Sequence, residues 1–337
     1  MRTGAPNYDL ENFRRGVTPG EVKRIVATVF GAKSTVTAMR ELPGGMYNST
    51  FIVETQAHPE PVVLRVAPDQ DKQFRSEWQL MRNEYAVQPY VAAVLSGYLP
   101  RVIAADWSHQ VIDRDYMVLS LLPGLPAPQV LDRYPRPTWA AYFEQMGGLA
   151  KRVHAVANDR FGTVAAPAHD SWSSAFLMSL SLIAEDSSRC GLDRSGVDEI
   201  HCIAAENALV LDRVGTASLL TGDLWTTNVL LSPDSDEHPE ITGIVDLDRA
   251  EWGDPLADWV IWMARKKPGT ERDSFWSGYG ALDVDDPSVR FRLALYSARH
   301  EAAVRLESAR LADAAGVEDG SEQLARSAES LRQMAVA

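Results

Sequence analysis

The chain has 337 residues, of which 45% are hydrophobic and 23% charged, a length that can hold one large domain or two lobes. No stretch approaches the roughly 18 apolar residues of a membrane span, and the first residues lack the apolar core of a signal peptide. We therefore expect a cytoplasmic protein with no membrane partner. The net charge of −13 argues against a nucleic-acid partner, whose phosphates need basic contacts. Cys190 and Cys202 are too few for a disulfide framework or a zinc site.

The negative charge is concentrated in the second part of the chain. Residues 1–123 contain 13 Lys and Arg and 13 Asp and Glu, whereas residues 124–337 contain 20 and 33, which accounts for the whole net charge of −13. An acidic surface of this kind can attract a cationic ligand by electrostatic steering. The alternative is that the charge only keeps the protein soluble.

The first predicted element is a helix over residues 18–30. Thr18 has the features of an N-cap, Pro19 stands at the first helical position, and Glu21 completes a capping box three residues after the cap.

Three strand-like runs follow, over residues 34–42, 51–54 and 62–66, and the first two are joined by a turn of small residues. A turn of this kind between two strands can place backbone N–H groups over phosphates, although two glycines alone also make an ordinary hairpin turn. The candidate nucleotide-binding residues of this turn are Gly44, Gly45, Asn48 and Ser49.

Arg65, in the third strand, supports the nucleotide-binding interpretation. A basic side chain about twenty residues after the turn can grip nucleotide phosphates, and Arg can do so with two donors. The alternative is an exposed Arg on an edge strand. Residues 73–94 are predicted to form the next helix, where Glu77 and Glu84 lie seven residues apart on one face and both qualify as the ion-pair partner of Arg65.

An apolar strand over residues 116–122 ends at Pro123-Gly124, and the pattern then becomes mainly helical. Further along, apolar residues recur at helical spacing and predict a long amphipathic helix. Those residues are Phe291, Leu295, Ala298, Ala302 and Leu306.

Three short segments carry the candidate chemistry: residues 221–228 (T-G-D-L-W-T-T-N), 244–248 (I-V-D-L-D) and 253–255 (G-D-P). In a phosphoryl-transfer enzyme one carboxylate orients or deprotonates the attacking hydroxyl, while an amide oxygen and a second carboxylate hold magnesium ions on the nucleotide. Asp223 fits the first role, and Asn228 and Asp246 fit the second. Gly-Asp and Asp-Pro pairs are also common turn signals, so the spacing alone would be weak.

The context of these residues strengthens the hypothesis. Residues 229–231 and 244–245 are short β-type runs separated by a turn-rich stretch, which predicts a hairpin. Asn228 would then stand at one end of the hairpin and Asp246 at the other.

The order G-D-L-x-x-x-N-V-L-L, then I-V-D-x-D, then G-D-P-L-A-D resembles the aminoglycoside phosphotransferase family, a branch of the protein-kinase-like fold that includes choline and fructosamine kinases. The resemblance covers about residues 34–265. Thr221 and Trp225 replace two histidines that are usual in the family, and Trp at the second position is similar to the fructosamine kinases. Neither position supplies a charge or a metal ligand, so the chemistry is retained, but the substrate class is left open.

The resemblance implies an α+β, bilobal protein-kinase-like fold, with a small β-rich N-lobe over residues 1–120 and a larger, mainly helical C-lobe over residues 121–337. It favours Glu84 as the partner of Arg65, which makes Glu77 a solvated surface charge. It places the hinge at Ser120 and Leu122, whose backbone groups would meet the purine edge of the nucleotide.

The resemblance also assigns supporting residues near the catalytic segments. His154 is expected to be a hydrogen-bonded structural histidine. Asp254 is expected to cap the helix that begins at Pro255, and Asp258 to accept backbone N–H groups of the catalytic loop.

The function implied is an O-phosphotransferase that uses ATP or GTP with Mg²⁺ to phosphorylate a hydroxyl of a small molecule. An antibiotic is the favoured acceptor, with resistance or self-protection of a producer as the role. The alternatives are a metabolic kinase for a sugar, a ketosamine or an amino alcohol, and a pseudokinase that serves as a nucleotide-binding module. Retention of Asp223, Asn228 and Asp246 together argues against the pseudokinase.

Overall fold

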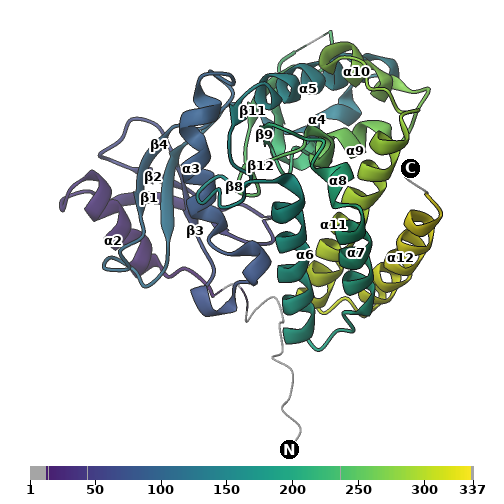
Figure 1. Cartoon of the computed structure of the whole chain (residues 1–337). Helices are drawn as coiled ribbons and strands as arrows, with labels where there is room; N and C mark the ends of the chain where they lie inside the picture. Colours follow the sequence, from purple (N-terminus) through teal and green to yellow (C-terminus); the bar gives the residue numbers. More distant parts are fainter. Residues whose placement is uncertain (1–12, 14, 44, 236, 335–337) are drawn as a thin grey trace, which may run out of the picture.

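The computed structural model describes residues 13, 15–43, 45–235 and 237–334. In Figure 1 a β-sheet and two flanking helices form the N-terminal part, and a larger, mainly helical part lies beside it. This arrangement confirms the α+β architecture with a β-rich first part and a helical second part. The boundary after residue 120 stays our interpretation. Among the described residues, no helix has the length and apolar character needed to span a membrane.

The N-terminal part is built on a five-stranded antiparallel sheet with the order β1-β2-β3-β5-β4. Its strands are β1 (Val36–Glu41), β2 (Ser49–Thr55), β3 (Val62–Val66), β4 (Val102–Asp106) and β5 (Tyr116–Ser120), and its helices are α2 (Pro19–Phe30) and α3 (Leu80–Ala92). Apolar residues of α2 share a buried cluster with β2, β3 and β5, while Met81 of α3 clusters with Met117 and Leu119 of β5. The sheet is therefore packed between the two helices, and β3 lies in its centre.

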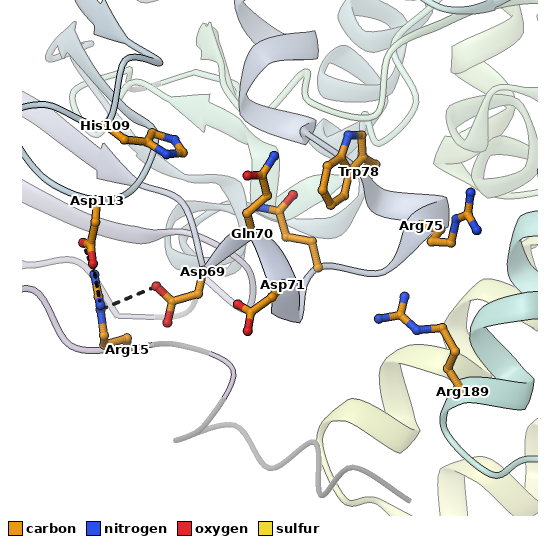
Figure 2. A pocket seen from close by; sticks show the side chains of 10 residues that line it. Arg15, Asp69, Gln70, Asp71, Arg75, Trp78, His109, Asp113 and Arg189 are labelled. Atoms are coloured by element: carbon orange, nitrogen blue, oxygen red, sulfur yellow. Dashed lines mark hydrogen bonds and ion pairs between the residues drawn. The ribbon is translucent and has the colours of Figure 1, made fainter.

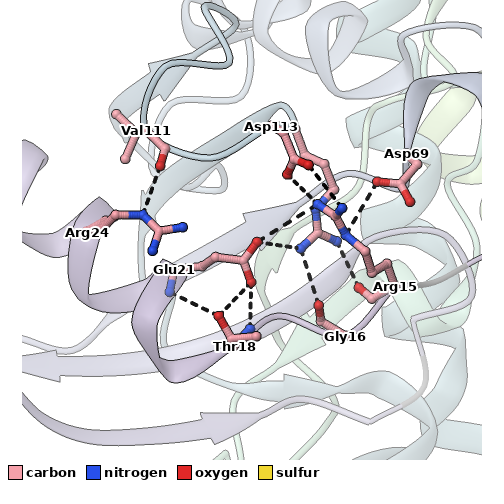
Figure 3. Close-up of polar contacts among 9 residues, drawn as sticks. Arg15, Gly16, Thr18, Glu21, Arg24, Asp69, Val111 and Asp113 are labelled. Atoms are coloured by element: carbon pink, nitrogen blue, oxygen red, sulfur yellow. Dashed lines mark hydrogen bonds and ion pairs between the residues drawn. The ribbon is translucent and has the colours of Figure 1, made fainter.

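The predicted capping box begins α2 (Figure 3). Glu21 Oε2 accepts the backbone N–H of Thr18 at 2.7 Å, and the Thr18 hydroxyl accepts the Glu21 N–H at 3.2 Å. Arg15, just before the helix, donates to Asp113 at 3.0 Å in the loop before β5. These contacts fix the start of α2 against the sheet.

The predicted helix over residues 73–94 is wrong in its first third, residues 73–79. Two 3-10 turns, η1 (Gln70–Lys72) and η2 (Arg75–Glu77), precede α3, and Gln79 adopts a left-handed conformation with φ of 58° that separates η2 from the helix. The buried carboxylate of Asp186 on α6 (Trp172–Arg189) accepts the N–H groups of Arg75 at 3.0 Å and Ser76 at 2.8 Å. A contact with a distant helix therefore determines the backbone here, and helical periodicity does not.

The C-terminal part consists of helices around two small sheets, with strand orders β11-β10-β6 and β7-β9-β12-β8. Its strands are β6 (Leu125–Pro126), β7 (Ala157–Asn158), β8 (Gly162–Thr163), β9 (Ala217–Leu220), β10 (Val229–Leu231), β11 (Ile241–Ile244) and β12 (Glu251–Gly253). Its remaining helices are α4 (Ala127–Val130), α5 (Trp139–His154), α7 (Ser195–Glu206), α8 (Ala208–Leu211), α9 (Trp259–Arg265), α10 (Ser274–Tyr279), α11 (Pro287–Arg310) and α12 (Ala314–Gln333). The 3-10 turns are η3 (Leu131–Arg133), η4 (Arg136–Thr138), η5 (Thr226–Asn228), η6 (Pro255–Ala257) and η7 (Glu271–Asp273). The predicted amphipathic helix is α11, and its five predicted apolar residues are all buried.

Helices α5 and α10 approach each other closely through two glycines. A side chain at Gly147 of α5 would collide with the carbonyl oxygen of Phe275, and one at Gly278 of α10 would collide with that of Glu144. The contact matters for the site because Tyr279, at the end of α10, shares a hydrogen bond of 2.8 Å with His154.

Gly147→Ala should therefore lower the free energy of unfolding by about 1–3 kcal/mol, since the added methyl group overpacks the helix crossing. Gly148→Ala is the matched control, because no atom lies within 4 Å of a side chain there, and it should stabilise α5 by up to about 1 kcal/mol. Urea unfolding of both variants measures the difference. Equal stability of the two would contradict the close approach.

Candidate active site

The predicted hairpin is formed by β10 and β11, which pair antiparallel with Val229 opposite Ile244. At its open end the carbonyl of Asn228 accepts the N–H of Val245 at 2.9 Å. This brings Asn228 next to the segment that carries Asp246, as the spacing predicted. Asp246 adopts a positive φ of 66°, which is uncommon for a non-glycine residue and recurs at functional sites.

Asp223 lies against the same hairpin end. The side-chain amide of Asn228 donates to the Asp223 carbonyl at 2.9 Å and to its carboxylate at 3.1 Å. Burial raises the pKa of Asp223 to about 7, and the nearby charge of Asp246 adds to this effect while Arg249 opposes it. A carboxylate with a pKa near neutrality is suited to accept a proton from a hydroxyl group.

The loop that carries Asp223 is fixed by contacts of the two preceding residues, Thr221 and Gly222. Gly222 has a φ of 77°, and a side chain there would collide with the carbonyl of Arg249, so glycine is required twice over. The buried carboxylate of Asp258 accepts the N–H of Thr221 at 2.7 Å and shares a 2.9 Å hydrogen bond with His154. The contacts expected of Asp258 and His154 are confirmed. Thr221, which replaces the histidine usual at this position, donates to Asp258 through both its backbone N–H and its hydroxyl.

Asp254 has the predicted capping contact. Its carboxylate accepts the N–H of Leu256 at 3.1 Å at the start of η6. It also accepts the hydroxyl of Tyr296 at 2.7 Å, from α11. The cap thereby joins the segment after β12 to the long C-terminal helix.

Arg65 is buried at 7% exposure and bridges two carboxylates. One guanidinium nitrogen donates to Glu84 on α3 at 2.5 Å, and another donates to Asp246 at 2.6 Å. Glu84 is thus the ion-pair partner of Arg65, and the alternative of an exposed Arg on an edge strand is wrong. Burial alone would raise the pKa of Asp246, but the charge of Arg65 and its hydrogen bond outweigh burial and keep that pKa below its usual value.

The expectation that Glu77 is a solvated surface charge is wrong. Its side chain is buried, and one carboxylate oxygen accepts from Arg249 at 2.7 Å while the other pairs with Arg310. Glu77 belongs to η2 and not to α3, so it shares no helix face with Glu84. The periodic spacing was misleading because the helix begins only at Leu80.

Sequence reasoning missed Asp248, the second carboxyl of I-V-D-x-D. It is 4% exposed and lies 4.0 Å from Arg65, and burial together with the charge of Asp246 raises its pKa well above the usual value. Two adjacent carboxyl groups beside one guanidinium do not ionise together readily. Asn83 of α3 donates to the Asp248 carbonyl at 2.8 Å and so fixes this loop. The repeated Asp was the signal that could have identified Asp248.

The predicted residues of the glycine turn differ in burial and in secondary structure. Gly44 lies outside the described residues, Gly45 is exposed, and Asn48 is buried. Ser49 is already the first residue of β2 and pairs with Val66, so it is less free than a turn residue. Tyr47, which lies between Gly45 and Asn48 in the sequence, is buried at 8% exposure, and the sequence analysis did not predict this.

At the predicted hinge, Ser120 uses its backbone N–H on the carbonyl of Arg101 at 2.9 Å. This N–H is therefore already hydrogen-bonded within the protein. The Leu122 side chain packs against Gly243 of β11. A Cβ atom added at Gly243 would lie 2.8 Å from a methyl carbon of Leu122. Both residues connect the sheet to the C-terminal part, and their contact with a nucleotide remains a prediction.

The donor set at the hairpin end fits Mg²⁺. The amide nitrogen of Asn228 is turned to Asp223, which leaves its oxygen as a ligand, and the Asp246 side chain is 38% exposed despite its bond to Arg65. Amide and carboxylate oxygens are the hard ligands that Mg²⁺ prefers, completed by water and phosphate oxygens. In the part of the chain that the structure describes, no group of three His, Cys, Asp or Glu residues forms an all-protein metal site.

A surface pocket of about 1010 Å³ lies away from this site (Figure 2). It lies over the 3-10 turns η1 and η2 and contains none of the predicted site residues. Basic and acidic side chains alternate around it, so it has no clear preference for an anion or a cation. Its lining residues are Arg15, Asp69, Gln70, Asp71, Gln73, Arg75, Trp78, His109, Asp113 and Arg189.

Comparison with known proteins decides the family. The family model described as the phosphotransferase enzyme family matches residues 38–296. The chain belongs to this family. It is a phosphotransferase enzyme with the kinase-like fold. None of the curated proteins compared matches the sequence significantly.

Solved structures agree in fold. The GDP and kanamycin complex of APH(2")-IIia matches with a TM-score of 0.65 at 18% identity, covering 92% of this chain and 98% of that one. The gentamicin complex of APH(2")-IIa gives 0.64 at 15% identity, over 94% and 99% of the two chains. A mutant of aminoglycoside phosphotransferase APH(4)-Ia with AMP-PNP and hygromycin B gives 0.60 at 16%, over 94% and 99%. The predicted bilobal kinase-like fold is confirmed.

The raised pKa of Asp223 predicts a pH-dependent cost to stability. The unfolded chain ionises this carboxyl near pH 4, whereas the folded chain does so near pH 7, so the free energy of unfolding falls as the pH rises between these values. Asp223→Asn should be more stable than the wild type at pH 8, by up to about 4 kcal/mol, since one pKa unit corresponds to about 1.4 kcal/mol. The difference should disappear towards pH 4.

Thermal unfolding between pH 4 and pH 8 measures this effect. Asp132→Asn, at an exposed position, is the control and should show no such trend. A constant difference between wild type and Asp223→Asn over this range would contradict the raised pKa.

Proposed function

We propose that this protein transfers the γ-phosphoryl group of ATP or GTP to a hydroxyl group of a small molecule in the cytoplasm, with Mg²⁺ as cofactor. In this proposal Asp223 orients and deprotonates the acceptor hydroxyl, and Asn228 and Asp246 hold the metal. Arg65, positioned by Glu84, contacts nucleotide phosphate. The observation that carries the proposal is the convergence of Asp223, Asn228 and Asp246 at one end of the β10–β11 hairpin.

The chemistry of the chain's own groups supports this assignment. The Asp223 carboxylate has a pKa near 7, so near neutral pH it can take the hydroxyl proton as the oxygen attacks phosphorus. Bound Mg²⁺ would neutralise charge on the phosphates and the leaving group. Arg65 adds a positive charge that is fixed by two carboxylates before any nucleotide binds, and such preorganisation favours the transition state.

We propose an antibiotic as the acceptor, with resistance or self-protection of a producer as the role. Structures similar in fold bind kanamycin, gentamicin and hygromycin B. The excess of acidic residues after residue 123 would attract a cationic molecule of this type. Trp225, two residues after Asp223 and 37% exposed, offers an aromatic face on which a sugar or a base could stack.

The roles of Asp246 and Asp223 can be separated by measurement. Asp246→Ala should abolish the Mg²⁺-dependent part of nucleotide affinity in calorimetry, because this carboxylate would hold the metal. Asp223→Asn should keep that affinity while kcat falls by a factor of about 10² or more. Binding without Mg²⁺ is the control and should not weaken in Asp246→Ala, because the variant removes one carboxylate partner of Arg65. Near-wild-type turnover in Asp223→Asn would refute the assignment of the catalytic carboxylate.

The acceptor class is tested by ionic strength. With nucleotide saturating, kcat/KM for kanamycin should fall steeply between low and high salt, because exposed charges are screened beyond about 8–10 Å at physiological ionic strength. A neutral sugar acceptor should show a flat profile in the same assay. If only neutral acceptors react and Trp225→Ala raises their KM strongly, the cationic antibiotic is the wrong class.

A further inference from the structure

Arg310 is the last residue of the 24-residue helix α11, yet it is 1% exposed. Its guanidinium pairs with the Glu77 carboxylate of η2. Three aromatic rings surround it, at 4.7 Å from Phe13, 5.2 Å from Phe74 and 5.7 Å from Tyr47. The end of a C-terminal helix is thus enclosed by residues of the N-terminal part of the chain.

Glu77 contacts both the glycine turn and two arginines. Its carboxylate holds Arg310 and Arg249, and its backbone carbonyl accepts the hydroxyl of Tyr47 at 2.9 Å. Tyr47 belongs to the glycine turn, between Gly45 and β2. Its ring also packs edge-on against Phe13 at 5.4 Å. One residue of the turn is therefore fixed in the same cluster that encloses Arg310.

Arg249, the second arginine paired with Glu77, lies near the carboxylates of the candidate active site. Arg249 follows Asp248, and its backbone carbonyl packs against Gly222. Its guanidinium, held by Glu77 at 2.7 Å, lies near enough to Asp223 and Asp246 to favour the ionised form of both. The position of Glu77 therefore affects both the glycine turn and the charge facing the site.

We propose that Arg310 is a positioning residue: with Glu77 it fixes the glycine turn through Tyr47 and the direction of Arg249. The consequence for turnover rests on the proposed function, in which the turn covers nucleotide phosphates. The end of α11 thereby supports the nucleotide side of the site, although it lies 87 positions after Asp223 in the sequence.

Arg305 provides a matched control on the same helix. It is also buried, at 4% exposure, but its guanidinium donates to Ser321 of α12 at 2.8 Å, within the C-terminal helices. Replacing either arginine by Met removes a buried cation from α11. Only Arg310→Met removes a contact with η2, and Glu77 keeps Arg249 as a partner in that variant.

The decisive measurement is amide hydrogen exchange of residues 45–49 in the nucleotide-free protein. Arg310→Met should accelerate exchange in this turn about tenfold or more relative to Arg305→Met, because local protection reports local opening. In steady-state kinetics Arg310→Met should raise the nucleotide KM about tenfold, with a smaller change in the acceptor KM. Arg310→Lys, which keeps the charge on Glu77, should restore part of both effects.

Tyr47→Phe tests the same connection without removing a buried charge. It deletes only the hydroxyl that donates to the Glu77 carbonyl, so exchange in the turn should rise about threefold with little loss of thermal stability. This variant and Arg310→Lys decide the question if Arg310→Met does not fold.

Equal exchange in Arg310→Met and Arg305→Met, or no change in Tyr47→Phe, would overturn the inference whatever the kinetics show. A wild-type protein that binds no nucleotide would instead overturn the proposed function. Faster exchange in that case would still establish that Arg310 positions the turn, so the two failures are distinguishable.

Discussion

The guanidinium of Arg65, buried between Glu84 and Asp246, is the interaction on which the site depends. It joins the central strand β3, helix α3 and the loop after β11 at distances of 2.5 and 2.6 Å. A buried cation requires paired and hydrogen-bonded partners, and removal of one partner costs about 3–5 kcal/mol. Any displacement of the sheet, the helix or the loop would leave one of these charges unpaired, so the three elements are held in one arrangement.

Arg suits this position better than Lys because its planar fork reaches two carboxylates at once. At Glu77 the roles of the charges are exchanged, because one carboxylate pairs with two arginines, Arg249 and Arg310. One of the two ion clusters includes a residue of α3, Glu84, and the other a residue of α11, Arg310. Local geometry of the site is thus determined by long-range ion pairs more than by the loops themselves.

Much of the site could be predicted because its signals are local in sequence. The β10–β11 hairpin follows from two short apolar runs around a turn, and the capping box of α2 lies within four residues. Glu77 and Arg310 could not be predicted, since they are 233 positions apart and neither has a local pattern. Glu77 was misassigned because periodicity continued through a segment where Asp186 holds the backbone in a 3-10 turn.

The balance of charge at the site gives a physical reason for a metal cofactor. Five carboxyl groups surround it, those of Glu77, Glu84, Asp223, Asp246 and Asp248, against the three guanidinium groups of Arg65, Arg249 and Arg310. Burial keeps the pKa values of Asp223 and Glu84 near 7 and that of Asp248 well above its usual value, so near neutral pH the remaining negative charge roughly balances the three guanidinium groups. Every one of these arginines already has a carboxylate partner, so a polyphosphate entering the site meets little uncompensated positive charge. Under the proposed function, divalent cations on the phosphates would supply it, and the side-chain oxygens of Asn228 and Asp246 would hold them.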